Sequence, residues 1–138
     1  MSTERKIAHR GTRFTIAYAR DSSGAFPAKM FIDALSVSEK AKVATLFKML
    51  GEGQTNNREK FGDLENGLYE LKSFQIRIPF AYSQLPSEKG TILLTHGFRK
   101  KRDKTPPSEI DRAKRVLRED ENLSKICSIN DPKKRKNP

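Results

Sequence analysis

The sequence has few of the residues from which disulfides and metal sites are built. Among its 138 residues Cys127 is the only cysteine, and the two histidines, His9 and His96, lie far apart. A single cysteine cannot form an internal disulfide, which fits a reducing compartment. No spacing of cysteine and histidine resembles that of a zinc site. We therefore expect a cytoplasmic protein with no metal and no other cofactor.

Long hydrophobic runs are missing as well. Hydrophobic residues make up 35% of the chain and charged residues 33%. No apolar stretch approaches the roughly 20 residues of a membrane-spanning helix, and the first residues, MSTERKIAHRGTR, contain no apolar signal core. This composition predicts one small globular domain with highly solvated parts and no membrane partner.

Negative charge is scarce relative to positive charge. Lys and Arg total 28 against 17 Asp and Glu, which gives a net charge of +11 at pH 7. Residues 124–138 hold five basic residues and one acidic residue, which leaves 23 basic and 16 acidic residues in 1–123. We expect a folded domain over 1–123 and a basic, disordered tail over 124–138. The surplus of positive charge predicts a polyanionic partner, and nucleic acid is favoured over a membrane surface.

Hydrophobic periodicity predicts an α+β domain with the element order β-α-α-β-β-β-α. Ser36 and Glu39 have the S-x-x-E spacing of a capping box, which predicts the start of the second helix. Thr105 is the expected N-cap of the last helix. We expect an antiparallel sheet with the helices on one face and the other face free for a ligand. The predicted strands are residues 13–19, 67–72, 74–83 and 91–98, and the predicted helices are residues 27–35, 36–50 and 106–121.

The apolar pattern also predicts how the last three strands pair. Pairing Leu71 with Ile76 keeps one face continuously apolar. The same register places Glu70 opposite Arg77 on the other face. The next hairpin then places Arg99 beside Arg77. A slip of one residue would reverse every side chain, so the pattern favours this register.

Basic residues gather on the polar face of the predicted sheet and on its rim. Like charges side by side destabilise a sheet, so a phosphate-binding surface explains them better than folding does. The alternative is a solvated face with a weak Glu70–Arg77 salt bridge. The polar face would hold Glu70, Lys72, Arg77, Arg99 and Lys101, and its rim Lys100, Arg102 and Lys104.

His96 falls on the apolar face near the sheet edge in this register. A structural histidine with a hydrogen-bond partner is the interpretation that we favour there. Because histidine is the commonest acid–base residue of enzymes, a catalytic role is the alternative.

Three segments resemble one protein family: LENGLYELK, IRIPFAY and ILLTHGFRKKRDKTPPSEIDRAKRVL. They are similar to the HigB-like, often phage-associated branch of the RelE/ParE toxin superfamily. The resemblance covers approximately residues 12–120. Its most specific part is the pattern HGFxKKxxKTPxxEIxxA, which matches at many fixed positions.

The resemblance implies a RelE-like fold and a ribosome-dependent mRNA endoribonuclease, an mRNA interferase that inhibits translation. Toxins of this kind use no metal: the 2′-hydroxyl of the RNA attacks the adjacent phosphate and leaves a cyclic or 3′-phosphate. That chemistry needs a base for the hydroxyl, cations for the pentavalent phosphate and an acid for the leaving oxygen. The resemblance also implies two partners, mRNA on the ribosome and a helix-turn-helix antitoxin.

The functional positions of the family fall on particular residues of this sequence. Glu70 matches a general base, Arg77 matches the arginine that holds the scissile phosphate, and Lys100 matches a position that stabilises charge. Two residues depart from the family pattern: Lys72 stands where arginine is frequent, and Pro79 removes a hydrogen-bond donor from the middle strand. The resemblance thus implies catalytic Glu70, Arg77 and Lys100, with RNA bound by Lys72, Arg99, Lys101, Arg102 and Lys104.

Two other functions stay open. A ParE-like toxin of the same superfamily would bind DNA gyrase, and a non-catalytic relative would only bind nucleic acid. The glutamate and the arginines on one sheet face favour the nuclease, because gyrase binding needs no RNA-cleaving groups.

Overall fold

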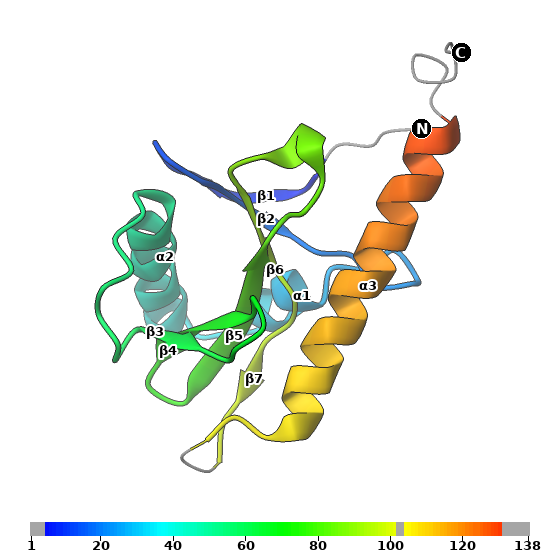
Figure 1. The fold of residues 1–138 in the computed structure, drawn as a ribbon. Coiled ribbons are helices and arrows are strands. Elements are labelled where there is room, and N and C mark those ends of the chain that lie inside the picture. The colour runs from blue at the N-terminus through cyan, green and yellow to red at the C-terminus, as the bar shows by residue number, and fades with distance from the viewer. Residues whose placement is uncertain (1–4, 102–103, 131–138) are drawn as a thin grey trace.

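Seven strands of the described residues form one sheet, and three helices pack against it (Figure 1). The computed structural model describes residues 5–101 and 104–130. This architecture confirms the predicted α+β class. The strands are β1 Ile7–Arg10, β2 Thr15–Tyr18, β3 Phe61–Asp63, β4 Tyr69–Ser73, β5 Ile76–Tyr82, β6 Thr91–Leu94 and β7 Phe98–Arg99. The helices are α1 Pro27–Asp33, α2 Val37–Gly51 and α3 Pro107–Asn130, with a short 3₁₀ turn, η1, at Pro86–Glu88.

The sheet is mixed rather than wholly antiparallel. Its strand order is β1-β2-β6-β5-β4-β3, and β7 continues beside β5 where β6 ends. β2 and β6 run parallel, with Ile16 beside Ile92, whereas the other described pairs are antiparallel. The antiparallel prediction is therefore wrong for this pair. The long connection between β2 and β6, which includes two helices and three strands, permits the parallel arrangement.

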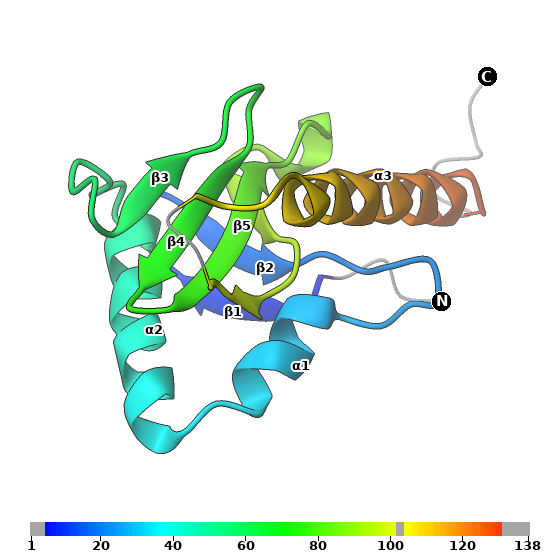
Figure 2. The ribbon, with the colours of Figure 1, turned by 90° about the horizontal axis from the view of Figure 1, so that it is seen from below.

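The helices cover both faces of the sheet, not one (Figure 2). α1 and α2 pack on one face, where Leu46 and Leu50 of α2 belong to the main hydrophobic core. α3 packs on the opposite face, with Val116 in one cluster with Ala17 and Leu93. The prediction that this face is free for a ligand is therefore wrong over β2 and β6. The small alanine side chains on this face of the sheet let α3 approach closely. The apolar stripe of α3 predicts that the helix packs on the sheet, but it does not indicate on which face.

The start of α2 confirms the predicted capping box. Ser36 Oγ accepts a hydrogen bond from Glu39 N at 3.1 Å, and Glu39 Oε1 accepts one from Ser36 N at 3.0 Å. These two bonds satisfy backbone N–H groups that the first turn of a helix leaves unpaired. Glu39 is thereby held at the N-terminus of α2, where it also meets a residue of β7 described below.

α3 continues to Asn130, beyond the predicted domain boundary at residue 123. Within this added length, Ser124 Oγ accepts hydrogen bonds from Arg5 Nη2 at 3.3 Å and Arg20 Nη2 at 2.7 Å. These contacts join residues more than 100 positions apart, so local sequence patterns do not reveal them. The division into 1–123 and 124–138 stays a prediction, since residues 131–138 lie outside the described part of the chain.

The β4–β5 hairpin is shifted by two residues from the predicted register. Lys72 lies opposite Arg77, where Glu70 was predicted, and Glu70 lies opposite Pro79. A two-residue turn at 74–75 sets this register, and β5 runs through Pro79 without a break. The side chains keep their predicted faces, because a shift of two positions preserves the alternation of a strand.

A bulge of one residue separates β6 from β7. Thr95 N and Thr95 Oγ1 both donate to the carbonyl of Pro79, at 2.9 and 3.2 Å. Further along, Phe98 lies opposite Arg77. Between the pairs Pro79–Thr95 and Arg77–Phe98, β5 has a single residue, Ile78. The segment opposite it has two residues, 96 and 97. The extra residue reverses the faces of the strand that follows it.

This bulge corrects two predictions. Arg99 does not lie beside Arg77, because it points to the opposite face of the sheet, toward α2. His96 faces α3 and not the apolar face under α1 and α2. Gly97 lies so close to α1 that a Cβ there would overlap the ring of Phe31, which explains why glycine stands at this position.

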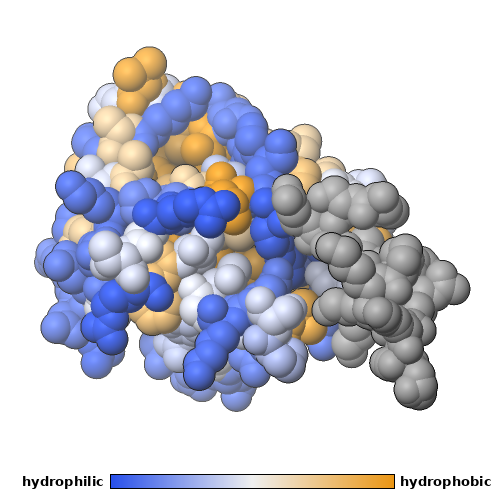
Figure 3. All heavy atoms as spheres, turned by 90° about the horizontal axis from the view of Figure 1, so that it is seen from above, coloured by the Kyte–Doolittle hydropathy of each residue, from blue (hydrophilic) through white to orange (hydrophobic). Residues whose placement is uncertain are grey.

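The surface seen in Figure 3 is predominantly hydrophilic, with small hydrophobic areas between the polar side chains. Among the described residues, no helix is both long enough and apolar enough to cross a membrane. Within the part of the chain that the structure describes, four large hydrophobic side chains are exposed, and of these Phe74 lies in the turn between β4 and β5. They are Met30, Val37, Phe74 and Tyr82.

Candidate active site

Three polar side chains on the α3 face of the sheet form what we call the β4–β5 cluster. β4 contributes Glu70 and Lys72, and β5 contributes Arg77, which lies opposite Lys72. Gly62 of β3 lies opposite Glu70. A Cβ at Gly62 would come within 3.3 Å of Glu70 Cγ and Oε2 and within 3.4 Å of Lys72 Cε. The missing side chain at Gly62 therefore leaves room for the cluster.

Glu70 is held by a residue from the loop before α3. The residue is only 7% exposed, and Oε1 accepts a 2.7 Å hydrogen bond from Thr105 Oγ1. Thr105 was predicted as the N-cap of α3, but the helix begins at Pro107 and the hydroxyl binds Glu70 instead. The sequence pattern predicts Thr105 only as a helix cap and does not place it in the site. Its position within the HGFxKKxxKTP pattern is the signal that could have identified it.

Arg77 braces the turn between β4 and β5. It is 7% exposed, and Nη1 donates hydrogen bonds to the carbonyls of Phe74 at 2.6 Å and Ile76 at 2.9 Å. Burial lowers the pKa of Arg77 from its ordinary value, and the charge of Glu70 opposes that shift. Arginine stays charged at neutral pH despite such shifts. Nη2 and Nε have no hydrogen-bond partner among the described residues, so they are the groups that an anion would meet.

The loop between β7 and α3 carries the predicted lysines past this cluster. Lys100 N donates to Gln75 O at 2.8 Å, which fixes the start of the loop at the β4–β5 turn. The Thr105–Glu70 bond fixes its end. Lys101 and Lys104, between these two anchors, are exposed to solvent. A polyanion that reached the cluster would therefore meet them first.

Two predicted RNA-binding residues are not part of the cluster as the structure describes it. Arg99 donates to Glu39 of α2, at 2.9 and 3.1 Å, on the other face of the sheet. This hydrogen-bonded pair lowers the pKa of Glu39 to about 2, so the carboxylate stays ionised and compensates the arginine. Arg102 lies outside the described residues.

His96 has the surroundings of a structural histidine. The side chain is fully buried, with Nδ1 3.1 Å from Thr95 Oγ1 and Nε2 2.9 Å from Glu109 Oε1. Its ring also stacks on Phe98, with 5.6 Å between the ring centroids. Burial lowers the pKa of His96, against the raising effect of the Glu109 hydrogen bond. Both ring nitrogens are engaged, so the residue ties the first turn of α3 to the bulge.

Residues 30–118 match the family described as phage-derived protein Gp49-like (DUF891). The chain belongs to the Gp49-like family. This is a family of RelE/HigB-type toxins from toxin–antitoxin systems, a type of toxin that is often an endoribonuclease. Membership implies an antitoxin partner. No match was found among curated proteins.

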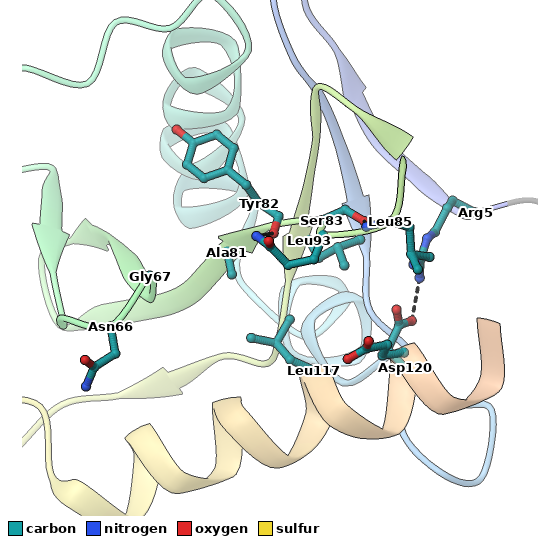
Figure 4. Close-up of a pocket in the computed structure, with 12 residues that line it drawn as sticks. Arg5, Asn66, Gly67, Ala81, Tyr82, Ser83, Leu85, Leu93, Leu117 and Asp120 are labelled. Carbon is teal, nitrogen blue, oxygen red and sulfur yellow. Dashed lines mark hydrogen bonds and ion pairs between the residues drawn. The ribbon is translucent and has the colours of Figure 1, made fainter. Parts of the chain in front are cut away.

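The Gp49-like segment contains the β4–β5 cluster, the basic loop with Thr105, and the first half of α3. A second polar cluster lies largely outside it (Figure 4). The buried Asp120 of α3 accepts hydrogen bonds from Arg5 and from the backbone and side chain of Arg20. Glu88 of η1 binds the other edge of the Arg5 guanidinium. These ion pairs hold the C-terminal half of α3 on the sheet.

A cavity of about 400 Å³ borders this second cluster. Leu117 of α3 and Ala81 of β5 lie on its apolar side, as Figure 4 shows. Oδ2 of Asp120 has no hydrogen-bond partner among the described residues. No local pattern in the sequence predicts the cluster, because its members come from distant segments.

The β4–β5 cluster of this Gp49-like chain suits proton transfer and phosphate binding. It combines one carboxylate with two cations, and the loop adds lysines on its rim. Among the described residues, no group of three or more His, Cys, Asp or Glu side chains is arranged to hold a metal ion. The carboxylate of Glu70 beside the cations of Lys72 and Arg77 supplies a base next to fixed positive charge.

Proposed function

We propose that the protein is a HigB-like toxin of the RelE superfamily, an mRNA interferase that cuts mRNA on the ribosome. The observation that carries the proposal is the β4–β5 cluster, where Glu70 lies on one sheet face with Lys72 and Arg77. A base and fixed cations are what the transesterification of RNA requires. Membership of the Gp49-like family supports the same function.

In the proposed reaction, Glu70 accepts the proton of an RNA 2′-hydroxyl. The 2′-oxygen forms a bond to the adjacent phosphorus, and the bond from that phosphorus to the 5′-oxygen of the next nucleotide breaks. Arg77 and Lys72 stabilise the added negative charge on the pentavalent phosphate. The ammonium group of Lys100 gives a proton to the leaving oxygen. The products are a 2′,3′-cyclic phosphate, which water can open to a 3′-phosphate, and a 5′-hydroxyl.

The contacts of Arg77 fit this role. Nη1 is occupied by two backbone carbonyls, which fixes the guanidinium plane. Nη2 and Nε then offer hydrogen bonds in a set direction, and a preorganised donor is more effective than a mobile one. Lys101 and Lys104 would contact phosphates further along the RNA, where charge matters more than geometry.

The proposed partners follow from this activity. The substrate is mRNA in the ribosome, so the protein would act in the cytoplasm. The antitoxin that the family implies would be a helix-turn-helix protein that neutralises the toxin by binding it.

Induced expression with mapping of mRNA 5′ ends tests the proposal. Wild-type protein should arrest growth and create new 5′ ends inside translated regions, and Arg77→Ala should do neither. Growth arrest with DNA breaks and intact mRNA would favour the gyrase-binding alternative. Nucleic-acid binding without growth arrest would favour a non-catalytic binding protein.

A further inference from the structure

Phe74 is placed where neither folding nor burial explains it. It is 77% exposed, at the first central position of the two-residue turn between β4 and β5. Its φ is 55°, in the left-handed region that bulky residues rarely adopt. The common two-residue hairpin turns take glycine or asparagine at such a position. The chain therefore keeps an exposed aromatic ring at a strained position.

Two cations fix this ring and its turn. Arg77 Nη1 donates to the backbone carbonyl of Phe74 at 2.6 Å, and this bond fixes the backbone of the turn. Lys42 of α2 places its Nζ 4.4 Å from the centre of the Phe74 ring, in a cation–π contact. The exposed aromatic is thereby braced by the same arginine that we assign to the scissile phosphate.

Positive charge surrounds the ring on both sides. One groove, of about 360 Å³, is lined by Lys42, Lys60 and Lys72 together with Phe74. A second groove, of about 210 Å³, is lined by Lys42 and Arg99 with Phe74. The acidic residues of the two grooves are Glu59 and Glu39, and the latter is paired with Arg99.

An aromatic ring among cations is the arrangement by which proteins bind unpaired nucleotides. The ring stacks on a base, and the cations follow the phosphate backbone. A single exposed apolar residue is ordinary on a protein surface. Here the strained backbone, the brace from Arg77 and the surrounding lysines occur together, and strain of this kind persists where function requires it.

We propose that Phe74 is a stacking platform for an unpaired base of single-stranded RNA, at the turn that joins the two strands of the β4–β5 cluster. The inference rests on the proposed function for the identity of this RNA as the substrate. The stacking itself requires only single-stranded RNA, so it can be tested without ribosomes. A protein side chain packed on Phe74 is the competing occupant, and the charge around the ring favours RNA over it.

Because the sequence contains no tryptophan, Phe74→Trp would introduce a single fluorescent reporter at the platform. The probe is an unstructured oligouridine RNA of about ten nucleotides at low salt, within the site sizes of single-strand binding proteins. Titration should quench the fluorescence of Phe74→Trp. The matched control is Met30→Trp on α1, which is also exposed, at 65%, and whose fluorescence should not change.

Affinity variants separate stacking from other roles. Phe74→Ala should weaken oligouridine binding about 5- to 150-fold, the effect of removing one base–aromatic stack. Phe74→Tyr should keep the affinity, whereas Phe74→Leu, which keeps apolar area without a π-system, should lose it. Phe74→Gly relieves the positive φ, so its melting temperature should not fall while its affinity does. A lower melting temperature for Phe74→Gly with unchanged affinity would mean that the ring is structural.

The outcomes distinguish this inference from the proposed function. Quenching of Phe74→Trp by oligouridine supports the platform even if the wild-type protein cuts no mRNA. Cleavage by Phe74→Ala at the wild-type rate, with no quenching of Phe74→Trp, overturns the platform and leaves the nuclease intact. Absence of oligouridine binding by wild type also overturns it, and loss of antitoxin binding in Phe74→Ala would then identify the competing occupant.

Discussion

Thr105 donates a 2.7 Å hydrogen bond to Glu70, a residue 35 positions earlier in the chain. The bond ties the loop before α3 to β4 and fixes one oxygen of the carboxylate. The other oxygen, Oε2, lies on the side of Gly62, which has no side chain of its own, with the Lys72 side chain nearby. In our proposal this second oxygen accepts the proton of the RNA 2′-hydroxyl, so Thr105 is a positioning residue.

Thr105→Val should lower the rate of mRNA cleavage. Valine has the shape of threonine but cannot donate, and a hydrogen bond to a charged group contributes about 1.5–3 kcal/mol, or roughly 10- to 150-fold in rate. Thr105→Ser keeps the hydroxyl and should restore most of the activity. Equal rates for the valine and serine variants would show that the hydroxyl does not position Glu70.

Glu70→Gln should abolish cleavage without abolishing ribosome binding. The amide oxygen can still accept from Thr105, but the side chain no longer takes up a proton, and loss of a general base costs about 10²–10⁴-fold in rate. Cleavage and ribosome co-sedimentation should be measured on the same preparation. If the glutamine variant cleaves as well as wild type, Glu70 is only a structural partner of the loop.

Arg77→Ala should reduce cleavage by about 10²–10³-fold, as for other groups that stabilise charge in a transition state. Arg118→Ala is the matched control, because it also removes one arginine but from the exposed outer side of α3. Melting curves of both variants show whether the β4–β5 turn survives the loss of the Arg77 brace. A folded Arg77→Ala protein with full activity would remove this residue from the mechanism.

The sequence is sufficient for the parts of the fold that repeat a local pattern. The capping box at Ser36 and Glu39, the α+β class, and the face on which Glu70 and Arg77 lie all depend on short-range spacing. The exact register does not, because a shift of two residues leaves every face unchanged. Only the turn at Phe74 decides between the two registers.

Other features depend on contacts between distant segments. The bulge at His96 reverses Arg99, and it arises because Thr95 binds Pro79 while Gly97 packs against α1. The length of α3 depends on Arg5 and other residues more than 100 positions away. Such features cannot be predicted from periodicity, since no local window contains both partners.

The basic loop should contribute to RNA or ribosome binding through its charge. A Lys100→Ala, Lys101→Ala double variant should bind ribosomes more weakly, and each lost phosphate contact should lower the salt slope by roughly 0.7–0.9. Deletion of residues 131–138 is the control, because it removes four cations but keeps Ser124 and its bonds to Arg5 and Arg20. This deletion should spare cleavage. If the deletion stops cleavage while the double variant behaves as wild type, residues 131–138 and not the loop are the basic segment that binds RNA or the ribosome.

Stability should decrease as the pH falls below 6.5, because burial lowers the pKa of folded His96 from that ordinary value. The unfolded chain then binds a proton before the folded protein does, so protonation favours unfolding until the lower, folded pKa is passed. Melting temperatures between pH 5.5 and 7.5 should fall toward the acidic end, and His96→Gln should flatten that change. A pH dependence that persists unchanged in His96→Gln would show that His96 is not the responsible group.

Cleavage of a defined mRNA by the purified protein, with and without translating ribosomes, tests the central claim most directly. We expect cuts within the translated region only when ribosomes are present, and downstream fragments whose 5′-hydroxyl can be labelled by a polynucleotide kinase without prior phosphatase treatment. Glu70→Gln should give no fragments in the same reaction. Intact mRNA with wild-type protein, or identical fragments from wild type and Glu70→Gln, would contradict a nuclease built on the β4–β5 cluster.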